Sequence, residues 1–382
     1  MPHESGEPHQ PSGPGAPTPD PYGPGKVYRS RGRARHRARR RSLRIAAWTA
    51  LGVVAVGGGG LAYLYSQLNG NIQGTDINAA LGKDRPGEQR NGSMDILLLG
   101  SDSRAGTHGQ YGSGVTGARS DTAMVLHVDK THKKASVVSV PRDTVVERPA
   151  CAKPGGGTAP AEHRAMFNES YQAGGPACTV KTVEKMSGVR MDHYLEVDFK
   201  GFTKLIDELG GVNVTTSKAI EDDSSHLSLP AGKHTLKGEQ ALELVRTRHA
   251  VSDGSDLGRI QLQQTFIKAL LHRVDSIGLA SDPTKLYDLA DTATRTVSAD
   301  SDLASATKLL GLAKDLKGIK PDRMNMVTLP VTYDPKDPGR VVPLKKASHQ
   351  VWDALREDRP IPGSAADNSV GDRGDAPVKA GT

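Results

Sequence analysis

Arginine and aspartate residues gather beside three apolar segments of this chain. They lie in Leu99–Arg104, Arg119–Thr122 and Pro141–Thr144, which contain Asp102, Arg104, Arg119, Asp121 and Arg142. Guanidinium groups donate paired hydrogen bonds to phosphate oxygens. Carboxylates are ligands that Mg²⁺ accepts while it keeps several waters. The combination favours a site for a dense polyanion, such as a pyrophosphate with its metal.

Two further pairs strengthen this interpretation. Arg246 and Arg248 stand at positions i and i+2, on one side of a segment that we expect to be extended. Arg259 and Gln263 stand at i and i+4, on one face of an expected helix. A single Arg–Asp pair is more often a loop salt bridge or a helix cap, so the hypothesis depends on the accumulation of these residues. Most familiar catalytic signatures, including a P-loop, H-E-x-x-H and G-x-S-x-G, are absent.

Strands and helices that could position these residues alternate along the chain. Continuous apolar runs predict buried strands, and apolar residues at helical spacing predict amphipathic helices. The polar residues 129–134 between two strands predict a hairpin turn. Together they predict an α/β fold of three layers, α-β-α, in which a mixed sheet is the central layer. The expected strands cover residues 94–100, 123–128, 135–140, 194–199, 212–214 and 324–329, and the expected helices cover 179–186, 202–209, 255–274, 286–293 and 303–316. In such a sheet the three Arg- and Asp-bearing segments can lie at one end.

The N-terminal region predicts a membrane anchor. The chain has 50 Lys and Arg residues, of which 10 lie in residues 1–44, and 43 Asp and Glu residues, of which 3 lie there. The remainder of the chain therefore carries 40 positive and 40 negative side chains. Residues 45–65 contain no charge and, at about 1.5 Å per residue, are long enough to cross a bilayer as one transmembrane helix. The basic run before it predicts a cytoplasmic N-terminus and an extracellular body at the cell membrane. A neutral body argues against nucleic acid as a partner. A cleaved or twin-arginine export signal is the alternative.

The domain limits follow from composition. We expect a disordered basic tail over 1–44, the transmembrane helix over 45–65, a polar linker over 66–92, a catalytic domain over 93–335 and a C-terminal extension over 336–382 that is largely disordered after about 357. Cys151 and Cys178 are the two cysteines, and an even pair in an exported protein usually forms a disulfide. Two reduced thiols are the alternative.

Several motifs together resemble the LytR-CpsA-Psr family of cell-envelope phosphotransferases. They stand in that family's order and spacing, strongly over residues 93–275, and include MDILLLGSDSR, RSDTAMVLHVD, VVSVPRD, FNESYQAGGPAC, LVRTRH and GRIQLQQ. The resemblance implies transfer of a glycopolymer from a polyprenyl-pyrophosphate carrier to peptidoglycan. A phosphodiester link would form and polyprenyl phosphate would be released. Teichoic-type, capsular and arabinogalactan-like chains all fit as the polymer.

The resemblance also implies roles for residues. Asp102 and Asp121 match the aspartates that hold Mg²⁺ (or Mn²⁺) in the family. Arg119, Asp121, Arg142, Arg246 and Arg248 would be catalytic, and Arg104, Arg119, Arg142, Arg246, Arg248, Arg259 and Gln263 would bind the pyrophosphate. Catalysis would then rest on positioning and on neutralising the charge of the transferring phosphoryl group.

Three positions leave alternatives open. The family commonly reads R-x-x-R-Q where this chain has Leu262 before Gln263, so the phosphate clamp is weaker or that position faces solvent or lipid. Asp143 is either the general base or a partner that orients Arg142, with the orienting role favoured. His249 is favoured as a surface or packing residue over a catalytic one.

Two other functions use the same residues. In a polyprenyl-pyrophosphate pyrophosphatase, water would replace the peptidoglycan hydroxyl as the nucleophile. In a non-enzymatic envelope regulator, the site would bind the polyprenyl lipid without turnover. Loss of turnover with retained lipid binding after Asp121→Ala would favour an enzyme over the regulator.

Overall fold

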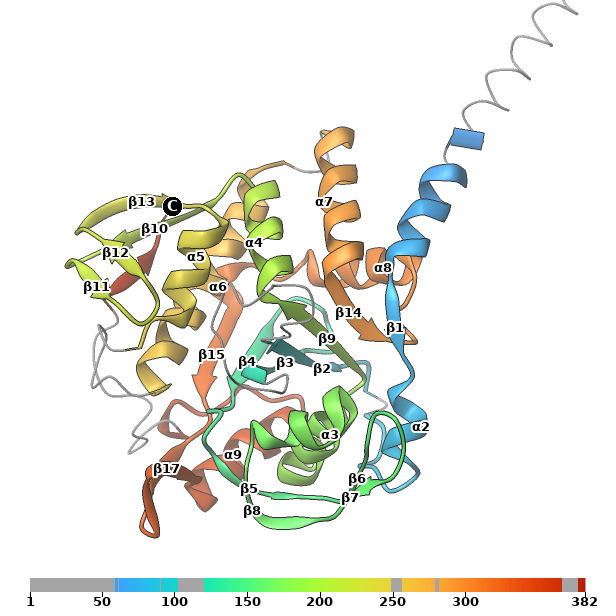
Figure 1. The fold of residues 1–382 in the computed structure, drawn as a ribbon, viewed down its shortest axis with the longest axis vertical. Helices are drawn as coiled ribbons and strands as arrows, with labels where there is room; N and C mark the ends of the chain where they lie inside the picture. Colours follow the sequence, from blue (N-terminus) through green and yellow to red (C-terminus); the bar gives the residue numbers. More distant parts are fainter. Residues whose placement is uncertain are drawn as a thin grey trace, which may run out of the picture. The chain divides into compact units, whose positions relative to one another are not determined.

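A seven-stranded mixed sheet organises the fold (Figure 1). In the computed structural model, residues 59–60, 62–89, 91–101, 120–248, 256–278, 282–365 and 377–381 are described. The strand order is β1-β14-β9-β2-β3-β4-β15. Their bounds are β1 Gln73–Thr75, β2 Met94–Ser101, β3 Ser120–Val128, β4 Ala135–Ser139, β9 His193–Asp198, β14 Val297–Asp300 and β15 Met324–Thr328. The five long predicted strands of this sheet are confirmed.

The strand directions bring three predicted segments to one edge. β3 runs antiparallel to both β2 and β4, so the turn between β3 and β4 is the predicted hairpin. β2 is parallel to β9, and β4 is parallel to β15. The carboxyl ends of β2 and β4 therefore meet the beginning of β3. Ser101 pairs with Ser120 across a register shift, which places Asp121 at this edge.

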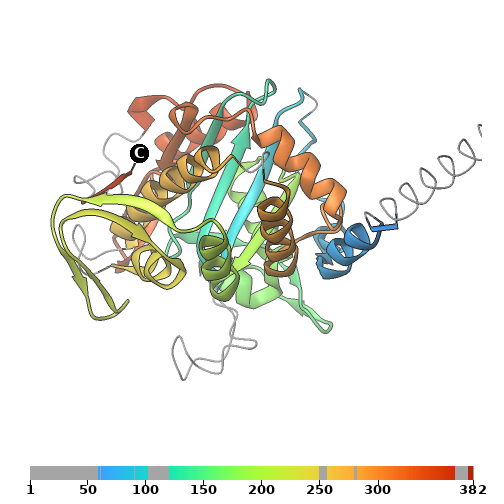
Figure 2. The same ribbon diagram turned by 90° about the horizontal axis from the view of Figure 1, so that it is seen from above.

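The two faces of the sheet pack against different helices, as the alternation of side chains along a strand requires. Leu97, Leu99 and Val125 share one hydrophobic cluster with residues of α2, α3 and α9. Ile96, Met124 and Leu126 share another with residues of α8. The helical layers can be followed in Figures 1 and 2. A mixed sheet between two layers of helices is therefore confirmed.

The five predicted helices are found in order but differ at their ends, and α2, α5 and α9 were not predicted. α4 begins three residues earlier than expected because Asp198 caps it through a hydrogen bond from the backbone N of Gly201. α3 begins ten residues before the predicted helix, which started at Thr179. The bounds are α2 Ile77–Leu81, α3 Glu169–Ser187, α4 Phe199–Glu208, α5 Gly238–Arg246, α6 Asp256–Ser276, α7 Pro283–Thr296, α8 Ala306–Leu316 and α9 Lys345–Arg356.

Residues 66–92 are not only a linker. β1 pairs with β14 in the main sheet, and Ile77 and Leu81 of α2 are buried in the core. Arg85 is tied to Glu184 of α3 by a buried ion pair of 2.6 Å. The prediction of a free linker was wrong because two buried apolar residues and one buried arginine are too few to stand out in a polar segment.

The C-terminal region also belongs to the fold. α9 buries Val351, Trp352 and Leu355, so the expectation of an extension beyond 335 was wrong. β16 (Val331–Asp334) and β17 (Asp337–Pro343) form a hairpin before it. β18 (Val378–Ala380), red in Figure 1, pairs with β10 (Val212–Thr216) beside β13 (Gly232–Leu236). The expectation of disorder after 357 was thus wrong for residues 358–365 and 377–381; residues 366–376 lie outside the described residues.

The predicted membrane helix falls largely outside the described residues. Of residues 45–65, the structure describes only 59, 60 and 62–65, and it describes none of 1–44. Among the described residues, no helix has the length and apolar character needed to span a bilayer.

Cys151 and Cys178 are joined as a disulfide. The bond links β6 (Cys151–Ala152) to α3. β6 pairs with β7 (Thr158–Ala159) to form a short hairpin. The alternative of two reduced thiols was wrong in this structure.

Candidate functional site

A cavity of about 230 Å³ lies at the sheet edge where β3 begins. Five of the residues singled out from the sequence line it: Asp121, Arg246, Arg248, Arg259 and Gln263. They come from β3, from α5 and the residues after it, and from the first turns of α6. The prediction that residues far apart in the sequence converge on one site is confirmed for these five.

Asp121 and Arg142 contact each other directly. Arg142 follows β4, and its Nη1 donates to Oδ1 of Asp121 over 2.8 Å. Nε of Arg142 lies 3.4 Å from Oδ2 of Asp143. This second contact is the geometry expected if Asp143 orients Arg142, the role favoured from the sequence.

Asp256 is a site residue that the sequence analysis missed. It is the first residue of α6, and its Oδ1 lies 3.4 Å from Nε of Arg142 and in ion-pair contact with Arg259. Asp256 therefore links two arginines that come from different elements. Its position three residues before Arg259, in the first turn of a helix, was a signal that could have found it.

Hydrogen bonds fix α6 against the sheet. Arg259 donates from Nη2 to the carbonyl oxygen of Asp121 over 3.0 Å. Nε2 of Gln263 donates to Oγ1 of Thr122 over 3.0 Å and to the carbonyl oxygen of Val245 over 3.1 Å. One glutamine thus joins α6, β3 and α5, which makes Gln263 a positioning residue as well as part of the cavity wall.

Arg246 and Arg248 line the same cavity, but the secondary structure that carries them differs from the prediction. The segment was predicted to be extended, but Arg246 is the last residue of α5 and only Thr247 and Arg248 leave the helix. The guanidinium of Arg246 lies 4.9 Å from the ring centroid of Phe199, a cation–π contact. Backbone N of Arg248 donates to Oδ2 of Asp222 over 2.8 Å, which fixes the chain where it leaves α5.

The arginines repel one another within the site. Burial lowers the pKa of Arg259 to about 10; the charge of Asp256 opposes this, and those of Arg248 and Arg142 add to it. Burial also lowers the pKa of Arg248, and the charge of Arg142 adds to this effect. By contrast, the pKa of Arg142 is raised, because Asp256, Asp143 and Asp121 outweigh the effect of its burial. A bound anion would relieve the repulsion between the guanidiniums.

One buried donor also calls for a ligand. Arg259 is 3% exposed, and its Nε has no hydrogen-bond partner among the described residues. Buried donors without acceptors are costly in a folded protein. The site is thus equipped to receive further acceptor oxygens.

The metal prediction rests on Asp121 alone among the described residues. Within those residues, no group of three or more His, Cys, Asp or Glu side chains is arranged to hold a metal ion. Asp121 still suits a metal that retains most of its waters, because Oδ1 is the oxygen engaged by Arg142 and the carboxylate stands at the cavity wall. Asp102, the second expected ligand, follows Ser101, which pairs with the residue before Asp121.

Four predicted residues cannot be placed. Asp102, Arg104, Arg119 and His249 lie outside the described residues. Their roles therefore stay predictions.

Leu262 occupies neither of the two environments expected for it. Its side chain is 0% exposed and belongs to a hydrophobic cluster with Leu244, Phe266 and Val212. The position therefore does not contact solvent, and the leucine contributes to the core between α5, α6 and β10. The expectation of a solvent- or lipid-facing position was wrong because helical spacing alone does not say which neighbour covers a face.

The remaining wall residues carried no chemical signal in the sequence. They are Thr122, Phe199, Ser224 and Val245. Phe199 could have been suggested by its place as the last residue of a predicted strand, at the edge where ligands gather. Thr122 and Val245 stand within segments that the sequence analysis named for their arginines, and Ser224 was recognisable only from the fold.

Comparison with known proteins gives a consistent family. The sequence profile described as the LytR_cpsA_psr family matches residues 64–357. The cell wall biosynthesis protein LcpA of Corynebacterium glutamicum is 29% identical over 349 residues, which cover 82% of this chain and 66% of LcpA. The polyisoprenyl-teichoic acid–peptidoglycan teichoic acid transferase TagT of Bacillus subtilis is 31% identical over 307 residues, which cover 75% of this chain and 88% of TagT.

A solved structure supports the same relationship. The structure described as TagT bound to LIIa-WTA aligns with a TM-score of 0.54 and 26% identity, over 72% of this chain and 96% of the other.

Proposed function

This chain belongs to the LytR_cpsA_psr family, and from that premise we propose that it transfers a glycopolymer from a polyprenyl-pyrophosphate carrier to peptidoglycan. The names of TagT and LcpA support transfer within cell-wall synthesis. The observation that carries the proposal is the cavity at Asp121, where Arg246, Arg248 and Arg259 converge. Repulsion between Arg248 and Arg259 there favours a bound polyanion.

The reaction would be a phosphoryl transfer. A hydroxyl oxygen of peptidoglycan attacks the phosphorus that bears the sugar, and a new P–O bond forms. The bond from that phosphorus to the bridging oxygen breaks, so the lipid leaves as polyprenyl phosphate with the electron pair on that oxygen. The hydroxyl proton is lost to a base, and the sugar becomes linked to peptidoglycan by a phosphodiester.

The described residues would act mainly by holding and neutralising the pyrophosphate. Arg248 and Arg259 would donate to its oxygens. Arg142 does not line the cavity itself and would act beside it, held by Asp121, Asp143 and Asp256. Electrostatic stabilisation of this kind is commonly worth about 10²–10³ in rate for each donor. Asp143 is an orienting residue in this scheme, not the base.

We include Mg²⁺, or Mn²⁺, as a cofactor in the proposal, held by Asp121 and Asp102. When bound, such an ion supplies charge neutralisation of the phosphate oxygens and helps to orient them. Asp121 would then act through two contacts, one to the ion and one to Arg142. An anchor over residues 45–65 would place the site on the outer face of the cell membrane, where peptidoglycan and the lipid carrier meet.

A binding experiment tests the polyanion site without relying on turnover. Polyprenyl pyrophosphate should bind the protein in detergent more tightly than polyprenyl phosphate, because Arg248 and Arg259 would contact the second phosphate. Arg259→Gln should remove most of this preference. Lys268→Gln, an exposed change on the same helix α6, should leave the preference intact. Equal binding of the two lipids by the unmodified protein would contradict the proposed site.

A further inference from the structure

A second polar groove lies where α3 begins, beside the disulfide-linked hairpin. Its cavity has a volume of about 640 Å³, and its wall includes Arg148, Lys153, Glu162, Glu169 and Gln172. None of these residues lines the cavity at Asp121. The groove is therefore a separate site.

Arg148 is the buried cation of this groove. It ends β5 (Val145–Arg148) and is 5% exposed. Nη2 donates to Oε2 of Glu162 over 3.1 Å, whereas Nε and Nη1 have no hydrogen-bond partner among the described residues. A guanidinium that is buried with two nitrogens unmatched is costly unless an acceptor joins it. A carboxylate or amide oxygen that enters the groove would provide one.

The other charges of the groove are of both signs. Lys153 is exposed in the loop of the hairpin and lines the same groove as Arg148. Glu169 begins α3, and its Oε2 accepts a hydrogen bond from the backbone N of Met166 over 3.0 Å. The groove thus presents cations for a carboxylate and a carboxylate for an ammonium group. A peptide that carries both groups matches this pattern better than an uncharged glycan does.

The walls are held in place by close packing. The disulfide between Cys151 and Cys178 joins the hairpin to α3. Gly174 interrupts the helical backbone of α3 there, and a Cβ on it would lie 2.6 Å from the carbonyl oxygen of Ala152 and 2.9 Å from Cβ of Cys178. Only glycine allows this approach of α3 to the hairpin, so the groove is formed before a ligand binds.

A backbone hydrogen bond links the beginning of α3 to the loop that carries Arg142. Backbone N of Asn168 donates to the carbonyl oxygen of Arg142 over 3.1 Å, and Glu169 is the next residue. Glu169 on the groove wall is therefore the sequence neighbour of Asn168, whose backbone contacts Arg142, the arginine that holds Asp121.

We propose that this groove binds the stem peptide of the peptidoglycan acceptor, with a peptide carboxylate at Arg148 and Lys153 and an ammonium group at Glu169. The inference rests on the proposed function, because it assigns the acceptor. It adds a reason for acceptor choice that the phosphate site does not contain. A glycan without peptides would be a poorer acceptor.

Peptide binding without any donor lipid tests the assignment. The full chain in detergent is titrated with a synthetic stem tetrapeptide and with the same peptide in which the carboxylates are amidated. Amidation should weaken binding to the unmodified protein about tenfold, since it removes the charge that Lys153 and Arg148 recognise. Lys153→Glu should bind the free-acid peptide about tenfold more weakly and should no longer distinguish the two peptides.

A matched variant controls for the change of charge. Lys185→Glu makes the same substitution at an exposed position near the other end of α3, and it should bind both peptides as the unmodified protein does. Equal losses in the two variants, or no effect of amidation on the unmodified protein, would overturn the proposal. Arg148→Gln, checked by thermal unfolding to be folded, should also lose the distinction between the peptides.

Transfer assays separate this inference from the proposed function. If transfer occurs but Lys153→Glu leaves the KM for the peptidoglycan acceptor unchanged, the groove proposal fails and the transferase stands. If no transfer occurs but the peptide binds with the expected dependence on Lys153, the groove stands and the proposed reaction fails.

Discussion

Arg142 holds Asp121 by a hydrogen bond of 2.8 Å between Nη1 and Oδ1, although the two residues are 21 positions apart, with Asp121 in β3 and Arg142 after the end of β4. The contact fixes a carboxylate and a guanidinium side by side at one sheet edge. Asp143 and Asp256 each lie 3.4 Å from Nε of the same arginine. One cation is therefore oriented by three carboxylates before any substrate binds.

Removing that orientation should impair catalysis without removing the charge. Asp143→Asn leaves the guanidinium of Arg142 in place but weakens one of its three ionic contacts. We expect kcat to fall by about tenfold, less than the loss of about 10²–10³ expected for Arg142→Gln, which removes the donor itself. Measuring kcat and KM for both variants tests this order. A complete loss of activity in Asp143→Asn with unchanged stability would instead identify Asp143 as the base.

Restoring the arginine common in the family at position 262 should not improve this protein. The Leu262 side chain is 0% exposed among apolar neighbours, so Leu262→Arg would bury a charge without a partner. We expect a loss of about 3 kcal/mol in the free energy of unfolding, measured by urea denaturation. Leu262→Met, which keeps the volume and apolar character, should cost less than about 1.5 kcal/mol. A stable and more active Leu262→Arg variant would show that the side chain at 262 reaches the phosphate site.

The Cys151–Cys178 bond should stabilise the fold appreciably. A cross-link between residues 27 apart in the sequence lowers the entropy of the unfolded chain, which raises its free energy by about 3 kcal/mol in the loop-entropy model. Urea denaturation with and without a reductant should show a loss of this size. Cys151→Ser with Cys178→Ser should reproduce the loss and should no longer respond to the reductant. Equal stability of the oxidised and reduced protein would mean that the disulfide does not stabilise the fold.

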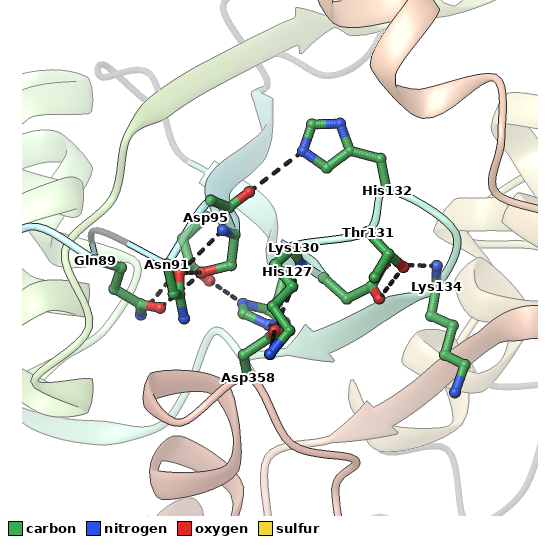
Figure 3. Close-up of polar contacts among 12 residues, drawn as sticks. Gln89, Asn91, Asp95, His127, Lys130, Thr131, His132, Lys134 and Asp358 are labelled. Carbon is green, nitrogen blue, oxygen red and sulfur yellow. Dashed lines mark hydrogen bonds and ion pairs between the residues drawn. The ribbon is translucent and has the colours of Figure 1, made fainter.

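His127 lies at the end of the sheet opposite the site (Figure 3) and should make the free energy of unfolding depend on pH. Nδ1 lies 2.9 Å from Oδ1 of Asp95, and Nε2 lies 3.2 Å from Oδ1 of Asp358. Burial lowers the pKa of His127, but the hydrogen bonds and charges of Asp95 and Asp358 outweigh it, so the pKa is raised above the ordinary 6.5. Asp192 and Lys130 are the other charged groups nearby: Oδ2 of Asp192 accepts from backbone N of Asp95, and Nζ of Lys130 lies 4.0 Å from Asp358.

The direction of the pH effect follows from this shift. A histidine whose pKa is raised in the folded state adds stability that is complete below the unfolded pKa of about 6.5 and is lost as the pH rises through the folded value. The free energy of unfolding should therefore decrease above pH 6.5 relative to His127→Gln, whose profile should be flatter in this range. Parallel profiles of the two proteins would show that His127 does not gain a proton on folding.

The sequence predicted the centre of the fold better than its margins. The strand ending at Ser101 contains the continuous apolar run Ile96–Leu99, and such runs identify buried strands. The first ten residues of α3 were missed because Gly174, Gly175 and Pro176 interrupt the helical pattern, and the structure shows a real break in the helix at the two glycines. α9 was missed because its buried residues, among them Trp352, are separated by charged and polar ones.

The charged residues of the site could be predicted from the sequence, but those whose role depends on how the elements pack could not. The accumulation of arginines along the chain pointed to Arg142, Arg248 and Arg259, because guanidiniums in such numbers need an anionic partner. Asp256 was missed although it stands three residues before Arg259, because its contact with Arg142 exists only once α6 places it between the two arginines. The same holds for Arg148, whose burial depends on how the disulfide-linked hairpin covers β5.

The most direct test of the proposed function is the reaction itself. The protein in detergent is incubated with a polyprenyl-pyrophosphate oligosaccharide and peptidoglycan fragments, with and without Mg²⁺, and both lipid monophosphate and sugar-linked peptidoglycan are measured. We predict that both products form together, that Mg²⁺ is required, and that Arg259→Gln slows both by about 10²–10³. Release of lipid monophosphate without coupling would identify a pyrophosphatase, and lipid binding with no release at all would contradict an enzymatic role.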